Sequence, residues 1–195
     1  MEAIVLGLIR HTDKASVLRC YTRAHGRINY IVYGSRQRLA GVCNPLSVVD
    51  ITVAGKIDPA GTTMPVVKEM TLTYVPQQLN TDVRRQSIAL FMAEILSNLL
   101  VHPLGDEQLY AFLCDTVTDL DRAEDIAEVH LRFLRALCVH MGFAISEEEH
   151  ADLLTQPHTR NERQSLLKAL CTYIEENADG FRAPKSLDVL MELFD

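Results

Sequence analysis

Residues 17–32, VLRCYTRAHGRINYIV, decide the fold of the first part of the chain. An apolar run at 17–21 leads to a turn at His25-Gly26, where glycine supplies the positive φ that a tight hairpin needs. After the turn, apolar side chains recur with a period of two, at Ile28, Tyr30 and Val32. This period is typical of a strand with one buried face. The stretch therefore predicts a β-hairpin shaped by His25 and Gly26.

Three further runs have the composition or the period of strands, and they lie at residues 4–9, 49–53 and 69–74. Turn signals rich in Gly, Pro, Asp and Ser separate the runs. Five short antiparallel strands within about 75 residues suit a small barrel or a sandwich. Because an open sheet would expose its edges, we expect the sheet to close.

From Thr81 onward the hydrophobic period is that of helices. Apolar residues recur at spacings of three and four at Ile88, Phe91, Met92, Ile95, Leu96 and Leu99. Thr81 or Asp82 can cap this helix, and His102-Pro103 ends it. Further helices are expected after Gly105, from about Ala123 to Met141, from a capping box of Asn161 and Gln164, and from about Ser186.

The two patterns divide the chain into two expected domains. Residues 144–160, which carry three consecutive acids and a Gln-Pro step, are expected to form an exposed, irregular connection. We therefore expect an α+β protein, with a β domain at residues 1–79 and an all-α domain at residues 80–195.

Charge is divided unequally between these parts. The whole chain of 195 residues has a formal net charge of −7. Residues 1–79 contain nine Lys or Arg and five Asp or Glu, a net charge of +4, whereas the remainder carries −11. A polyanion is attracted to the first part and repelled by much of the second. The alternative is that these basic side chains only solvate a surface.

The sequence predicts neither a membrane protein nor an enzyme. Its longest apolar stretch is interrupted before the roughly 18 residues of a membrane span, and its first residues lack the features of a signal peptide, so a cytoplasmic protein is expected. The five cysteines show no metal-binding spacing, so neither a metal nor another cofactor is expected. No nucleotide-binding, hydrolase or metalloprotease motif occurs, and histidines near 150–158 are the remaining metal alternative.

Basic residues are concentrated at the turns of the expected barrel. Arg23 and Arg27 flank the hairpin, and Arg36 and Arg38 follow Gly34-Ser35. Long cationic side chains on loops at one end of a barrel can track a phosphate backbone. The nearby tyrosines either stack on bases or belong to the core, and these are Tyr21, Tyr30 and Tyr33.

The ordered set of motifs resembles RecO, the bacterial recombination mediator family. In the first part, the resemblance is carried by Ile4-Val5-Leu6, by Tyr21-Thr22-Arg23-x-x-Gly26-Arg27, by Tyr33-Gly34-Ser35-Arg36 and by Asn44-Pro45-Leu46. The later motifs are VVKEMTLTY (66–74), SIALFMAEILSNLLVHPLGDEQLYAFL (87–113), HLRFLRALCVHMGFA (130–144) and SLDVLMELF (186–194). The last motif is similar to the tail of the Bacteroidetes branch.

The resemblance implies an OB-fold followed by a helical domain. It implies binding of single- and double-stranded DNA, annealing of complementary strands, and work with RecR to load RecA onto DNA coated by single-stranded-DNA-binding protein. It thus implies a role in DNA repair and recombination through the RecF pathway, in the cytoplasm and associated with the nucleoid. The expected phosphate contacts are Lys14, Arg19, Arg23, Arg27, Arg36 and Arg38.

The resemblance also implies a site on the helices for the acidic, apolar C-terminal tail of single-stranded-DNA-binding protein, for which Arg132 and Arg135 are the candidates. Many members carry a four-cysteine zinc element, but the matching stretch at 146–163 has no cysteine, so zinc is not expected here. The alternative from another class is a protein-interaction adaptor whose barrel binds a partner and not DNA.

Overall fold

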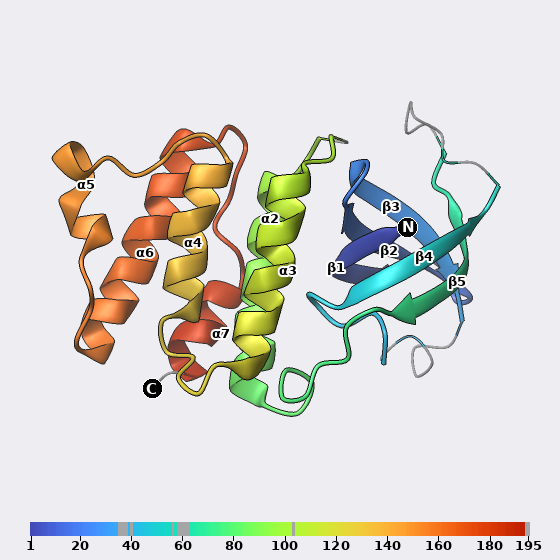
Figure 1. Cartoon of the computed structure of the whole chain (residues 1–195), viewed down its shortest axis with the longest axis horizontal. Coiled ribbons are helices and arrows are strands. Elements are labelled where there is room, and N and C mark those ends of the chain that lie inside the picture. The colour runs from blue at the N-terminus through green and yellow to red at the C-terminus, as the bar shows by residue number, and fades with distance from the viewer. Residues whose placement is uncertain (35–38, 40, 56, 58–62, 103, 194–195) are drawn as a thin grey trace.

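The computed structural model places a five-stranded barrel ahead of a group of helices (Figure 1). It describes residues 1–34, 39, 41–55, 57, 63–102 and 104–193. The strands are β1 (Glu2–Arg10), β2 (Ala15–Thr22), β3 (Gly26–Tyr33), β4 (Val48–Ala54) and β5 (Val66–Leu72). Their order around the closed barrel is β1-β2-β3-β5-β4.

The barrel closes through a mixture of antiparallel and parallel pairs. β1, β2 and β3 form an antiparallel meander, β4 pairs with β1 and β5, and β3 meets β5 in parallel at Ile31 and Val66. The interior is apolar and includes Val5, Leu18, Cys20, Tyr30, Val49 and Ile51. This arrangement is that of an OB-fold, so the expected fold class is confirmed.

Six helices follow in the described part of the chain. They are α2 (Val83–Leu99), α3 (Glu107–Arg122), α4 (Val129–His140), α5 (Glu147–Leu154), α6 (Arg160–Asn177) and α7 (Ser186–Leu193). In Figure 1, α2 and α3 stand between the barrel and the pair formed by α4 and α6, and α5 is farthest from the barrel. The barrel therefore faces one layer of helices only.

Two predicted helix starts are confirmed by their caps. The Asp82 carboxylate accepts a hydrogen bond from the backbone N–H of Arg84. The Asp106 carboxylate accepts from the backbone N–H groups of Gln108 and Leu109. Both side chains satisfy amide groups that a first helical turn leaves unpaired, which is the reason that the local sequence predicts them.

Three local expectations were wrong. The third helix begins at Val129 and not near Ala123, whose carbonyl oxygen accepts a hydrogen bond from Arg85 Nη2 at 2.7 Å. The stretch expected to be irregular contains α5, because its three acids fall in the first helical turn, where the helix dipole favours negative charge. The capping box of α6 is formed by Thr159 and Glu162, two residues before the predicted pair.

A second buried apolar cluster, separate from the barrel interior, joins the outside of the barrel to the helices. Outward-facing barrel residues belong to the same buried cluster as the helices, and these are Ile4, Leu6, Tyr21, Leu46 and Val48. The hydroxyl oxygen of Tyr21 also accepts a hydrogen bond from the backbone N–H of Asp106 at 3.2 Å. Contact with α2 and α3 therefore removes one side of the barrel from solvent.

A single carboxylate holds the connection between barrel and helices. Asp121, buried near the end of α3, accepts hydrogen bonds from the Tyr74 hydroxyl at 2.7 Å and from the backbone N–H groups of Gln77, Gln78 and Leu79 at 2.9, 2.8 and 2.7 Å. Burial alone would raise the pKa of Asp121, but these hydrogen bonds outweigh burial and lower the pKa to about 2.

We expect Asp121→Asn to lower the free energy of unfolding by about 2 kcal/mol, because the substitution removes the charge and leaves buried N–H groups without acceptors. Urea denaturation at pH 7 measures the change. Asp119→Asn is the control, because the carboxylate of Asp119 is largely exposed and lies 3.7 Å from Arg132. Equal stabilities of the two variants would contradict this account of the connection.

The same carboxylate predicts a pH dependence. The folded-state pKa of about 2 lies below the ordinary value of an aspartate, so the stability that Asp121 contributes is present above about pH 4 and is lost as the pH falls toward 2. Urea midpoints measured from pH 7 to pH 2 should fall less steeply for Asp121→Asn than for the unchanged protein. Parallel curves would assign the acid sensitivity to other groups.

Candidate nucleic-acid interface

The two arginines of the β2–β3 hairpin are engaged within the molecule. Arg23 forms ion pairs with Glu2 on β1, at 3.0 Å, and with Glu107 at the start of α3. The hydrogen bond that Arg23 donates to Glu107, and then the one that it donates to Glu2, raise the pKa of Arg23. Arg23 thus bridges the barrel and the helices with a half-exposed side chain.

Arg27 lies on the face of β3 that looks toward α2. Its Nη1 donates a hydrogen bond to the carbonyl oxygen of Ser97 at 2.7 Å and reaches that of Leu100 at 3.5 Å. These carbonyls are among the last of α2, where a cation complements the helix dipole. Burial, and then the nearby charge of Arg19, lower the pKa of Arg27.

The hairpin turn itself packs against the loop between α2 and α3. Gly26 has a φ of +63°, as expected, and a Cβ at this position would overlap the backbone of Leu104. A Cβ on Gly105 would overlap the backbone of Ala24. Because backbone meets backbone here, the turn is covered by the helices. The expectation that the cations share one end of the barrel is wrong for Arg23 and Arg27.

Another set of basic residues lies at the opposite end of the barrel, because consecutive antiparallel strands turn at alternate ends. Lys14 is exposed in the β1–β2 turn, and Arg10 beside it pairs with Asp13. Lys14 and Gly34 line the same hollow of about 300 Å³. Arg36 and Arg38 follow Gly34 in the sequence, but they lie outside the described residues.

Arg19 lies at mid-strand on β2, opposite Gly7 and Asn29, and it makes no ion pair within the described part of the chain. It lines a larger hollow of about 730 Å³ between the barrel and the helices, which we call the barrel–helix groove. Four segments line the groove: residues 6–9 and 43–45 of the barrel, residues 90–98 of α2, and residues 182–185 after α6.

Two further cations of the groove were missed by the sequence analysis. Arg182 and Lys185 line it together with Arg19, and both are exposed. They lie in the part of the chain with a net charge of −11, so a count by domain conceals them. The local signal is the FRAPKS segment at 181–186, in which Arg182 and Lys185 flank Ala183-Pro184 without an acidic residue among them.

The three tyrosines considered as stacking platforms divide into two groups. Tyr21 and Tyr30 are buried, with 1% and 0% of their surface exposed, so they belong to the core. Tyr33 is 63% exposed and pairs with Ala15, next to Lys14. Of the three, Tyr33 alone has a ring face accessible to a base.

The two arginines predicted to bind a partner differ in their contacts. Arg135 donates hydrogen bonds to the carbonyl oxygens of Leu153 at 2.8 Å and Thr155 at 2.5 Å, and it thereby attaches the end of α5 to α4. Arg132 has a half-exposed side chain 3.7 Å from Asp119. Arg132 therefore remains more accessible to an acidic partner than Arg135.

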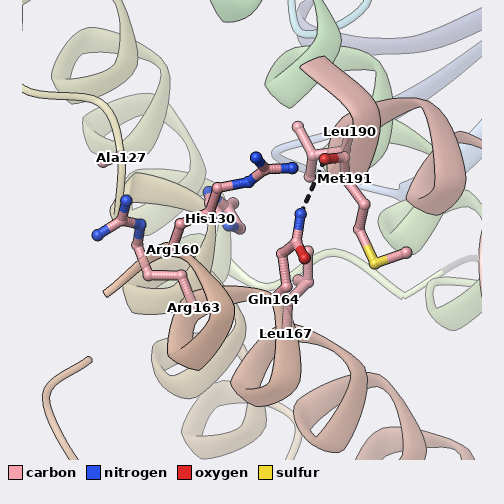
Figure 2. Close-up of a pocket in the computed structure, with 8 residues that line it drawn as sticks. All are labelled: Ala127, His130, Arg160, Arg163, Gln164, Leu167, Leu190 and Met191. Atoms are coloured by element: carbon pink, nitrogen blue, oxygen red, sulfur yellow. Dashed lines mark hydrogen bonds between the residues drawn. The ribbon is translucent and has the colours of Figure 1, made fainter. Parts of the chain in front are cut away.

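Figure 2 shows a small hollow where α4, α6 and α7 meet, near His130. Its volume of about 20 Å³ has room for about one water molecule, which excludes an organic ligand. Gln164 Nε2 donates a hydrogen bond to the carbonyl oxygen of Met191 at 3.0 Å across this hollow. Burial, and then the charges of Arg163 and Arg132, lower the pKa of His130 to about 4, so its imidazole is neutral at pH 7.

The described residues offer no obvious centre for metal chemistry. All five cysteines carry free thiols, and four of them are buried. Within the described ranges, no three His, Cys, Asp or Glu side chains gather as metal ligands do. None of the helices in these ranges combines the length and the hydropathy that a transmembrane helix requires.

Comparison with known families matches both parts of the chain. Residues 1–73 match the model of the recombination protein O N terminal region, and residues 80–153 match that of the recombination protein O C terminal region. The two models together cover the barrel and the helices as far as α5. These matches agree with the motifs from which the sequence analysis predicts the family.

Several curated proteins are similar over the whole chain. The DNA repair protein RecO of Flavobacterium johnsoniae is 26% identical over 234 aligned positions, which cover 99% of this chain and 98% of the relative. That of Flavobacterium psychrophilum is 28% identical over 236 positions, with the same coverage. That of Porphyromonas gingivalis is 31% identical over 148 positions, covering 72% of this chain and 59% of the relative. Because the first two alignments exceed 195 positions, those relatives contain segments that this chain lacks.

The contacts of the hairpin predict that Arg27 stabilises the fold. Arg27→Ala should lower the free energy of unfolding by about 1–3 kcal/mol, because the carbonyl groups at the end of α2 lose a charged donor. Arg19→Ala, on the neighbouring strand, should change it by less than about 0.5 kcal/mol. Urea denaturation of both variants measures the difference, and equal stabilities would show that Arg27 does not hold α2.

Proposed function

The chain belongs to the recombination protein O (RecO) family of DNA repair proteins, and on that premise we propose that it binds single- and double-stranded DNA and anneals complementary strands. We also propose that the protein helps RecR to load RecA onto DNA coated by single-stranded-DNA-binding protein. The observation that supports DNA binding best is the availability of two predicted contacts on the barrel: Lys14, which is exposed near the exposed ring of Tyr33, and Arg19, which forms no ion pair among the described residues.

Annealing is compatible with a surface of exposed cationic side chains. Two complementary strands repel each other through their phosphates, and cationic side chains reduce this repulsion while base pairing supplies the specificity. No covalent bond is formed or broken, so no nucleophile or catalytic base is needed. An OB-fold suits the task, since its strands and loops form an open surface for an oligonucleotide.

The proposed phosphate contacts differ in the intramolecular interactions that they would lose on binding DNA. Lys14 and Arg19 form no ion pairs among the described residues, so DNA meets little intramolecular competition there. Arg23 and Arg27 would have to leave Glu107 or the end of α2 to reach a phosphate. We therefore assign the main contacts to Lys14 and Arg19, and we keep Arg36 and Arg38 as proposed contacts from the sequence.

For the helical part, we propose that it receives the acidic tail of single-stranded-DNA-binding protein. Arg132 is the proposed contact because its guanidinium is half-exposed and its ion pair with Asp119, at 3.7 Å, is long and solvated. Arg135, by contrast, would lose two hydrogen bonds to carbonyl oxygens if it turned toward a partner. RecR and RecA remain proposed partners on the strength of the family alone.

A second candidate function is that of a protein-interaction adaptor. It is favoured by the engagement of Arg23 and Arg27 within the molecule, which reduces the positive charge available to DNA. A pull-down with single-stranded-DNA-binding protein, with and without its last residues and after nuclease treatment, separates tail recognition from bridging by DNA. An adaptor would retain the tail interaction while failing to bind free oligonucleotides.

The DNA-binding proposal predicts a steep dependence on salt. We expect the double variant Lys14→Ala and Arg19→Ala to bind a fluorescent single-stranded oligonucleotide about tenfold or more weakly than the unchanged protein. The slope of log affinity against log salt should fall in magnitude by about 2. Arg84→Ala with Lys168→Ala is the charge-matched control, since both side chains are exposed on helices. Failure of the unchanged protein to bind at low salt would overturn the proposal.

The tail proposal predicts a specific role for one arginine. Arg132→Ala should weaken binding of a peptide with the acidic tail sequence by about tenfold, because a charge-assisted hydrogen bond is lost, whereas Arg132→Lys should retain part of the affinity. Fluorescence anisotropy of the labelled peptide measures both. An affinity that is the same for Arg132→Ala and the unchanged protein would remove Arg132 from the site.

A further inference from the structure

We propose that the barrel–helix groove holds the sugar–phosphate backbone of a single DNA strand, with Arg19, Arg182 and Lys185 as its cationic contacts. This inference rests on the proposed function and adds to it a path for the strand. Arg182 and Lys185 lie beyond residue 153, where the match to the C-terminal family model ends. The site is therefore assigned from the structure of this chain.

The cations of the groove come from distant parts of the sequence. Arg19 projects from β2 of the barrel, whereas Arg182 and Lys185 belong to the segment between α6 and α7. Glu94 is the one acid among the described residues that line the groove, and its carboxylate accepts hydrogen bonds from the backbone N–H and hydroxyl of Ser186, at 3.0 and 2.7 Å. The charge that faces the groove is thus positive in sum.

Residues 182–185 are held in place at both ends. Asn98 Nδ2 donates a hydrogen bond to the carbonyl oxygen of Arg182 at 2.9 Å, and Ser186 is bonded to Glu94 on the same helix. The side chain of Arg182 is 81% exposed and pairs with Glu175 at 3.2 Å. An exposed pair of this kind contributes little, so a phosphate can replace Glu175 at small cost.

The lining favours the backbone of a strand over its bases. None of the described lining residues is aromatic, so the groove offers no platform for base stacking. The apolar side chains of Leu8, Ile9 and Pro45 can contact sugars, and three cations can contact successive phosphates. We expect binding in the groove to be independent of base sequence, and we expect a single strand to enter where a double helix is too wide.

The continuity of the surface favours a long polyanion over a short acidic peptide. Leu8 lines both the barrel–helix groove and the hollow that contains Lys14 and Gly34. A strand that leaves the groove along β1 therefore reaches Lys14 at the far end of the barrel. Tyr33 is exposed at the same end and offers the stacking surface that the groove lacks.

The test compares two double variants. The groove variant combines Arg182→Ala and Lys185→Ala, and the control variant combines Arg84→Ala and Lys168→Ala. In a salt series with a fluorescent single-stranded oligonucleotide, we expect the groove variant to bind about tenfold or more weakly and to lose about 2 from the salt slope. The control should match the unchanged protein. A second double variant, Arg182→Gln and Lys185→Gln, removes the charges and keeps polar side chains. Its urea midpoint shows whether a loss of binding comes from the loss of charge or from a loss of fold.

A second measurement locates the strand. A photoreactive amino acid at Ala183, which is exposed between the two cations, should crosslink to single-stranded oligonucleotide, whereas one at Lys168 should not. If the unchanged protein binds DNA and the variants at Arg182 and Lys185 bind with the same affinity, the groove is overturned as the path of the strand and the proposed function stays intact. Loss of acidic-peptide binding instead of DNA binding would assign the groove to a protein partner, and absence of DNA binding in the unchanged protein would overturn both proposals.

Discussion

The buried carboxylate of Asp121 is the constraint on which the arrangement of barrel and helices depends. It gathers the Tyr74 hydroxyl and three consecutive backbone N–H groups, so the chain that leaves β5 is fixed to the end of α3. Arg85 acts beside it, donating to the carbonyl oxygens of Leu120 and Ala123 at the same helix end. Four accepted hydrogen bonds compensate the desolvation of a charge that would otherwise be too costly to bury. The docked barrel and helices also form the two walls of the barrel–helix groove.

The packing of the barrel against α2 and α3 determines which cations of the barrel remain available to a polyanion. Covering one side of the barrel with α2 and α3 places the β2–β3 hairpin against helix termini, where Arg23 meets Glu107 and Arg27 meets the carbonyl oxygen of Ser97. Each arginine thus places a barrel cation against negative charge of the helical part, which is a carboxylate for Arg23 and the C-terminal carbonyl groups of α2 for Arg27. The free positive charge is left on the opposite end and along β2. The overall charge of −7 is therefore a poor guide to where a polyanion binds.

The annealing that we propose requires DNA to be held without being held too tightly. Exposed cations satisfy this requirement, since their contacts with phosphates are screened by salt and exchange readily. The barrel–helix groove arranges some of these cations along one path. Its two walls belong to parts of the chain that the apolar core joins, so a strand lying in it would contact barrel and helices together. The division at residues 79 and 80 stays a prediction from the sequence.

The sequence by itself determined the five strands and the described helices other than α5, although it placed the start of α4 too early. Strand period, turn glycine and the helix-start residues Asp82 and Asp106 are local signals, because each depends on backbone groups within a few residues, and the ordered motifs predict the family. The sequence also marked Lys14 and Arg19 among the candidate contacts. Only the tertiary structure decided which cations are engaged and which face solvent. Arg27, which the sequence marked as a candidate contact, meets the end of α2, whereas Arg182, which the sequence analysis missed, faces a solvent-exposed groove. The carbonyl groups that Arg27 binds lie 70 and 73 residues away in the sequence, so no local pattern records them.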